Sequence, residues 1–378
     1  MVVFQRFWAL FFLTGALLAT VPGDSLVWIG VNKFYNYETT EAIAILSEAR
    51  TEFPENPTVH LTWAAARWLH SQAHDPVETT YTILEESLSE IVPVYRGLVD
   101  KYPGNPAYRL YLGSAIGLKA RVDLGRKEWF ATLVDAYRGF QIIREVARDN
   151  PAMVDAQLPI GIVETYASMS GFLVRWSAML FGLNPDQTAG LAKIETAANQ
   201  GDFSWIEASS IKSFLDLWVY RDFPSALRHS QRLATRFPKN FYFNIMYAES
   251  LIRTHQSHRA KTQLDYLAAR YGELTPTQQR WYGGYLAFEE GLFAAEAGDW
   301  DRAYQKSSRA IEIYGAEMDV ILTNAWLLKG MSLDVSGNRE EALRAYRAGI
   351  ALDNMTAAIQ AAKQYEQQPF APENAPGF

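Results

Sequence analysis

Two pairs of histidines have spacings that could place two imidazoles on one face of a helix. His70 and His74 are four residues apart, and His255 and His258 are three residues apart. Two imidazoles can hold a zinc ion only with further ligands and with groups that orient each ring. Both pairs stand at expected helix ends among polar residues, where an exposed histidine is ordinary, so we expect no metal site.

Adjacent glutamates are the other candidates for chemistry. Glu289-Glu290 and Glu340-Glu341 could supply acid and base, but such catalysis needs a cleft and two carboxyl groups in unequal environments. These pairs fall at helix ends or on polar faces. The chain also lacks cysteine, HExxH, GxSxG, GxGxxG and the phosphate-binding GxxxxGK[ST] pattern. We therefore expect no enzymatic activity and no cofactor.

The elements that would position any site repeat along the chain. The clearest unit runs from Asn324 to Asn354, with a turn at Gly337-Asn338 between two helical patterns. Small and aromatic residues recur at i, i+4, i+7 in both: Trp326, Gly330 and Leu333, then Ala342, Tyr346 and Gly349. Small residues let two helix backbones approach, and the large rings fill the space beside them. This unit resembles the tetratricopeptide repeat (TPR), a pair of antiparallel helices in 34 residues.

The same spacing recurs upstream. Small residues occupy the matching slots at Ala42, Ala49, Ala226, Ala260, Ala303 and Ala310. Prolines at 54, 103 and 151 stop helices, because proline cannot continue the hydrogen-bond ladder. These prolines are 49 and 48 residues apart, which predicts middle helices about two turns longer than the standard ones. We expect an all-α, TPR-like helical-hairpin solenoid (an α-α superhelix) of about sixteen helices over 24–365.

A groove lined by the first helix of each pair is the first candidate for binding. If the register is right, its lining includes Tyr242, Tyr285, Phe288, Asn324 and Leu327. Aromatic groove residues can grip a peptide segment of a partner protein. The alternative is that the long helices bury these same side chains against the next turn of the superhelix.

An apolar run at Gly171–Leu183, GFLVRWSAMLFGL, is the second candidate. Arg175 is its only charge, and Trp176 follows. A buried helix is the plainer interpretation, and Arg175 would then need a carboxylate partner. Alternatively, the run is a surface that docks a partner, a lipid or a membrane interface, with Arg175 and Trp176 at its rim.

The two ends of the chain suggest an N-terminal targeting signal and a C-terminal disordered tail. Arg6 precedes an apolar run from Phe7 to Val21, which spans about 22 Å as a helix and is shorter than the ~30 Å hydrocarbon core. This pattern at 1–23 predicts a secretory signal peptide and a periplasmic or secreted protein, with an uncleaved anchor as the alternative. The proline-rich segment 366–378 predicts a disordered tail.

Composition and a second resemblance complete the interpretation. The formal net charge is −7, which argues against a nucleic-acid partner. Residues 154–171 and 190–243 resemble uncharacterised bacterial exported TPR proteins and, distantly, the eukaryotic TPR-like family of inclusion-body clearance. That resemblance implies an architecture and transfers no site. We therefore expect a non-catalytic exported scaffold for a protein or peptide; the alternative is an envelope-associated module that binds a lipid or a small apolar ligand through 171–183.

Overall fold

The computed structural model describes residues 21–126, 129–169 and 186–374 of the chain. This part contains seventeen α-helices, two short 3-10 helices and no strand. The helices are α1 (Asp24–Tyr35), α2 (Thr39–Glu52), α3 (Val59–His74), α4 (Val77–Lys101), α5 (Pro106–Gly125), α6 (Trp129–Asp149), α7 (Gln157–Met169), α9 (Gln187–Gln200), α10 (Trp205–Trp218), α11 (Phe223–Arg236), α12 (Phe241–Arg253), α13 (Ser257–Tyr271), α14 (Pro276–Glu296), α15 (Trp300–Glu312), α16 (Val320–Val335), α17 (Arg339–Ile350) and α18 (Ala357–Gln367). The all-α prediction is confirmed.

Consecutive helices pack in antiparallel pairs, and small residues set their approach. Gly330 of α16 lies so close to the Tyr346 ring of α17 that a β-carbon added there would be 2.3 Å from a ring carbon. Ala303 of α15 and Ala342 of α17 are fully buried, as the repeat register requires. These contacts are the TPR-like arrangement predicted from the spacing.

The prolines end the helices where the sequence indicated, and the middle helices are long. α2, α4 and α6 end at Glu52, Lys101 and Asp149, each two residues before a proline. α4, α5 and α6 have 25, 20 and 21 residues, against 14 in α2. The two extra turns expected from the proline spacing are therefore present in α4–α6.

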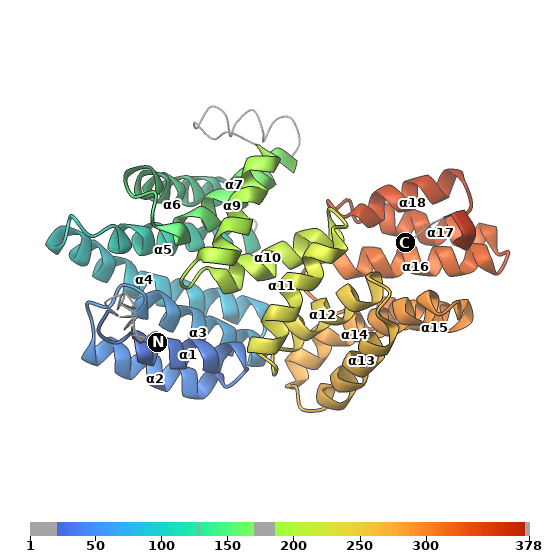
Figure 1. The fold of residues 1–378 in the computed structure, drawn as a ribbon, viewed down its shortest axis with the longest axis horizontal. Helices are drawn as coiled ribbons and strands as arrows, with labels where there is room; N and C mark the ends of the chain where they lie inside the picture. Colours follow the sequence, from blue (N-terminus) through green and yellow to red (C-terminus); the bar gives the residue numbers. More distant parts are fainter. Residues whose placement is uncertain (1–20, 127–128, 170–185, 375–378) are drawn as a thin grey trace, which may run out of the picture.

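The superhelix closes on itself, which the repeat pattern did not predict. In Figure 1, the blue N-terminal helices α1–α3 lie beside the yellow helices α10–α12, far along the sequence. The side chain of Asn240 donates to the Tyr35 carbonyl at 3.0 Å, and the Lys239 amide donates to Asn36 Oδ1 at 3.1 Å. The hydroxyl of Thr275 donates to the carbonyl of Ala73 across the same interface. In an open solenoid each repeat would touch only its neighbours.

The two ends of the chain differ in what the structure describes. Residues 1–20, which hold most of the expected signal peptide, lie outside the described residues. At the other end, α18 continues to Gln367, and Phe370 is 3% exposed. The Phe370 amide donates to Asp334 Oδ2 at 2.8 Å, and its ring packs against Trp300 and Tyr365. The expectation of a disordered tail is wrong for 366–374, because the apolar Phe370 has a core to bury in.

Among the described helices, none has a stretch both long enough and apolar enough to cross a bilayer.

Candidate binding site

A cavity of about 260 Å³ lies where the closed superhelix brings five helices together. The ends of α1 and α3 form one wall, and the first turns of α10, α12 and α14 form the other. More than half of its lining residues are aromatic: Phe34, Tyr35, Tyr37, Trp68, Tyr242, Phe243, Trp281 and Tyr282. Its polar lining residues are Gln72, Glu207, Ser210, Asn240 and Gln278. We call this space the aromatic cavity.

Helix caps hold the cavity wall in place and also close the superhelix. Asn240 caps α12 by accepting from the Phe243 amide at 3.0 Å, and its Nδ2 donates to the Tyr35 carbonyl. Thr275 and Gln278 form a reciprocal capping box at the start of α14, while the Thr275 hydroxyl also donates to the C-terminal end of α3. The residues that cap the N-termini of α12 and α14 therefore also fix the geometry of the cavity wall.

Of the described residues that line the aromatic cavity, Glu207 is the only acidic one. It sits in the first turn of α10, deep within the protein, yet its side chain is accessible to water, so the accessible part faces the cavity. It accepts a hydrogen bond from the Tyr35 hydroxyl and forms no ion pair within the described residues. Burial raises the pKa of Glu207, and the bond from Tyr35 opposes that rise.

The tyrosines around the cavity stay protonated and act as donors. Burial, followed by the charge of Glu207, raises the pKa of Tyr35 well above its usual value. Burial does the same to the pKa of Tyr37, whose hydroxyl lies 3.1 Å from that of Tyr282. Trp68 Nε1 is buried without an acceptor in the part of the chain that the structure describes. The wall is therefore apolar, rich in donors, and carries one acceptor group that can be negatively charged.

The residues that the sequence predicts to line a groove lie in different environments. Tyr242 lines the aromatic cavity. Tyr285 and Phe288 are buried, at 4% and 1% exposure, so they do not line an open groove. They continue the face of α14 that Trp281 and Tyr282 present to the cavity, but deeper in the core. There the Tyr285 ring stacks on Tyr314 at a centroid distance of 6.2 Å.

The other predicted residues do not join the aromatic cavity. Asn324 is buried and its Nδ2 donates to the Val320 carbonyl at 2.9 Å, within α16. Arg175 and Trp176, with the rest of 171–183, lie outside the described residues. The structure thus brings one of the predicted binding residues into the cavity.

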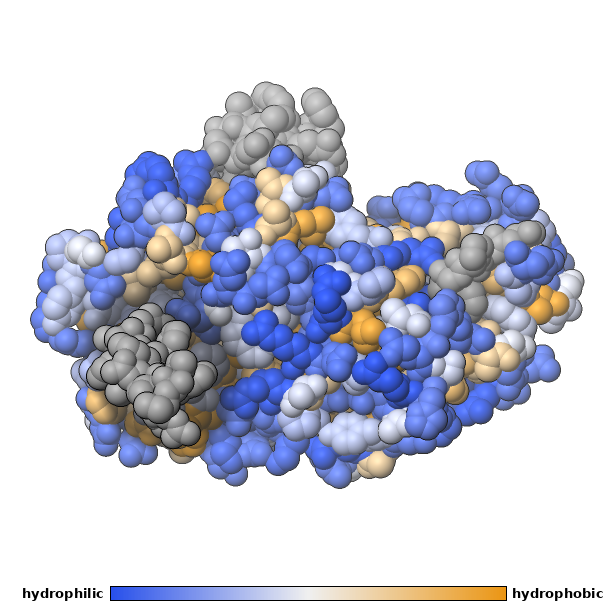
Figure 2. All heavy atoms as spheres, viewed as in Figure 1, coloured by the Kyte–Doolittle hydropathy of each residue, from blue (hydrophilic) through white to orange (hydrophobic). Residues whose placement is uncertain are grey.

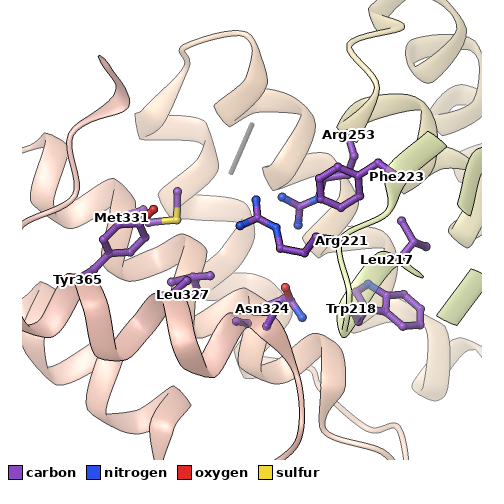
Figure 3. A pocket seen from close by; sticks show the side chains of 12 residues that line it. Leu217, Trp218, Arg221, Phe223, Arg253, Asn324, Leu327, Met331 and Tyr365 are labelled. Atoms are coloured by element: carbon purple, nitrogen blue, oxygen red, sulfur yellow. The ribbon is translucent and has the colours of Figure 1, made fainter. Parts of the chain in front are cut away.

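A second, smaller pocket lies between α10–α12 and α16–α18 (Figure 3). In Figure 3, Arg221 reaches into the space between Trp218 and Asn324 on one side and Met331 and Tyr365 on the other. The pocket measures about 30 Å³. That volume suits one or two water molecules and is too small for a ligand side chain.

Two buried carboxyl groups lie behind this pocket. Glu249 is fully buried; it accepts from Trp218 Nε1 at 2.7 Å and pairs with Arg253 at 3.1 Å. Glu289 is also fully buried, and neither of its oxygens has a hydrogen-bond partner among the described residues. Burial first, and then the charge of Glu249, raises the pKa of Glu289 well above its usual range. Burial and the nearby Glu249 therefore both favour the protonated form of Glu289.

The histidine pairs serve local structure in the described chain. His70 Nδ1 lies 2.8 Å from Thr39 Oγ1, and its ring stands 4.5 Å from that of His74. His255 pairs with Glu296 on the surface. Nowhere in the described ranges do three or more histidine, aspartate or glutamate residues gather as metal ligands could.

Sequence reasoning missed most of the cavity because its residues come from segments about 200 positions apart. The hydroxyls of Tyr37 and Tyr282 meet across 245 positions, and Tyr35 meets Glu207 across 172. One local signal was available: Glu207 and Ser210 are three apart and share a face of α10. That face carries a charge among apolar neighbours. The repeat period does not tell which other helices pack against it.

Comparisons with known proteins concern the fold. No known family model and no curated protein matches the chain. A tetratricopeptide repeat protein from Parabacteroides merdae is 13% identical, covering 82% of this chain and 98% of its own, with a TM-score of 0.32. Human IFIT1, as a dimer with PPP-AAAA, is 10% identical over 93% of this chain and 87% of its own, with a TM-score of 0.40. A Rap protein in complex with competence and sporulation factor is 11% identical over 90% and 77%, with a TM-score of 0.37. Such likeness concerns architecture alone, and the architecture of this chain is a TPR-like solenoid of helix pairs.

Proposed function

We propose that this chain is a non-catalytic scaffold that binds a segment of a partner protein in the aromatic cavity. The observation that carries the proposal is the cavity itself, in which aromatic side chains from α1, α3, α12 and α14 surround one carboxyl group from α10. Aromatic pockets of this kind hold the anchoring side chains that dominate binding energy at protein interfaces.

The dimensions support an anchoring side chain. The volume of about 260 Å³ exceeds that of an engineered cavity of roughly 150 Å³ that binds benzene. It lies just under the 300–1,000 Å³ range, approximately, of sites for whole small molecules. One large side chain of a partner fits this space, with the rest of its segment outside.

The outer surface offers less for recognition on the face shown in Figure 2. That face is predominantly hydrophilic, with hydrophobic residues scattered over it. Scattered apolar residues are usual on any soluble surface and do not mark an interface. A hollow lined by rings therefore supports binding better than this face does.

A selection experiment tests the proposal. Random decapeptides displayed on phage are selected on the wild-type chain and then measured against Ser210→Trp, which fills the cavity from α10. Ser210 lines the cavity and makes no hydrogen bond among the described residues, so the change removes no hydrogen bond. Peptides anchored in the cavity should lose at least about tenfold in affinity.

The matched control is Ser257→Trp, an exposed position at the start of α13. It should leave the affinity of the same peptides unchanged. Melting curves of both variants establish that they are folded. Peptides that bind Ser210→Trp as tightly as the wild-type chain would contradict a role for the cavity.

We also propose that the protein is exported, on the strength of the Arg6 and Phe7–Val21 pattern. Expression in a Gram-negative host, followed by fractionation and N-terminal sequencing, tests this. We expect a mature N-terminus near Asp24 in the periplasmic fraction. A cytosolic protein that retains Met1 would refute it.

The alternative of a lipid or small apolar ligand bound through 171–183 has no described structure to support it. The aromatic cavity favours a different ligand, because a neutral acyl chain would offer the Glu207 carboxylate neither a cation nor a further hydrogen bond.

A further inference from the structure

We infer that the aromatic cavity selects a basic side chain, lysine or arginine, from the bound segment, with its cationic group beside Glu207. This inference rests on the proposed function and adds the chemistry of recognition. Among the residues that the structure describes, no other charged residue lines the cavity, so the Glu207 carboxylate sets the sign of the preferred guest.

In the described part of the chain, the Glu207 carboxylate has no counterion. Its one hydrogen bond within the described chain comes from the neutral Tyr35 hydroxyl, and no lysine, arginine or histidine pairs with it there. A carboxylate in an apolar setting is costly unless a cation or hydrogen bonds compensate for it. Its place in the first turn of α10 favours the ionised form only in part. A guest cation supplies the missing partner.

The surrounding rings suit the same guest. A sphere of the cavity's volume has a radius of about 4 Å, so a cation inside it comes within reach of several ring centroids, near the ~6 Å limit of cation–π attraction. Trp68, Trp281 and Tyr242 line the cavity around it. The aliphatic stem of lysine or arginine packs against rings while its head meets the carboxylate.

Peptides from the selection provide the first test. Each lysine or arginine in a cavity-dependent peptide is replaced by methionine, which keeps length and loses charge. One replacement should weaken binding to the wild-type chain by about tenfold or more and binding to Glu207→Gln by about twofold or less. The difference between the two chains isolates the contact between the side chain and the carboxylate.

The outcomes separate this inference from the proposed function. Peptides that need the open cavity but contain no sensitive basic residue, or that bind Glu207→Gln as well as wild type, overturn the inference and leave the scaffold proposal standing. Peptides that ignore Ser210→Trp overturn the scaffold proposal itself.

A second test needs no peptide, because the chain has no cysteine of its own. A single cysteine at Ser210 is modified with either of two methanethiosulfonates, one carrying trimethylammonium and the other carrying sulfonate. The same reagents on Ser257→Cys give the reference ratio of rates. The cationic reagent should be favoured at position 210 by about threefold or more over that reference.

Adding Glu207→Gln should return the ratio at position 210 to the reference value. Melting curves of the single and double variants show that the comparison is made on folded chains. Equal ratios at 210 and 257 in the presence of Glu207 would overturn the inference whatever the peptides do.

Discussion

At the residue scale, the chain keeps two carboxyl groups in unusual places, and they have different consequences. Glu207 faces a water-accessible cavity and can meet a ligand. Glu289 is sealed in the core, where both oxygens lack partners among the described residues. The sequence drew attention to Glu289 only as part of an adjacent pair, which it placed at a helix end or on a polar face. α14 instead turns Glu289 inward and lets Glu290 reach Lys306.

The raised pKa of Glu289 makes a prediction about stability. The folded state holds a proton that the unfolded chain releases above about pH 4.5, so this residue stabilises the fold at low pH and its contribution is lost as pH rises toward the folded pKa. Glu289→Gln removes that dependence. Urea unfolding at pH 5.5 and 7.5 should show that the free energy of unfolding of the variant, relative to that of the wild-type chain, rises by up to about 1.4 kcal/mol for each pH unit.

Glu290→Gln is the control for this measurement. It removes a surface ion pair with Lys306, which is worth about 0–1 kcal/mol, and should shift stability by a small and constant amount. If the advantage of Glu289→Gln over the wild-type chain shrank as pH rose, Glu289 would not carry a proton in the folded state.

At the element scale, spacing was a good guide to helices and to their closest contacts. The prolines fixed where α2, α4 and α6 end, and Ala303 and Ala342 are buried as the repeat register required. The repeat pattern did not predict the close backbone contact between the long helices α5 and α6, because glycines stand there in place of the alanines of the repeat. Gly139 of α6 lies against the backbone of α5, where a β-carbon would be 2.6 Å from the Gly113 carbonyl oxygen.

Gly139→Ala should therefore destabilise the chain, by about 1–3 kcal/mol, because the β-carbon meets backbone that cannot move aside. Gly97→Ala in α4 is the matched control, since nothing lies within 4 Å of its added β-carbon. It should stabilise the helix by up to about 1 kcal/mol. Urea midpoints decide the matter, and a neutral Gly139→Ala would mean that α5 and α6 pack further apart.

The repeat register itself is tested in α17. Ala342 is fully buried against α16, so Ala342→Leu should cost about 1–3 kcal/mol through overpacking. Glu341→Leu, one position away with half its side chain exposed, should change the urea midpoint little. Comparable losses from the two substitutions would show that the assigned faces are reversed.

At the scale of the whole molecule, closure of the superhelix creates the site. A period of 34 residues describes how each pair meets the next one and carries no information on whether distant pairs meet. The sequence therefore predicted the solenoid, but it could not join Tyr35 to Glu207 or Trp68 to Trp281 around one cavity. Tyr285 and Phe288 are buried, which is one of the two alternatives that the sequence left open for them.

The distance across the closure is the most direct test of this account. The chain has no cysteine, so nitroxides can be attached at His74→Cys and Thr277→Cys alone. The Thr277 hydroxyl lies 3.4 Å from the His74 carbonyl although 203 positions separate them. Electron spin resonance should place the two labels within about 20 Å, two helix diameters. In an open solenoid, roughly five helix pairs separate α3 from α14, and each pair advances the stack by about one helix packing distance of 8–10 Å, so the labels would lie about 40–50 Å apart. A distance distribution centred there would contradict the closed superhelix and the cavity that depends on it.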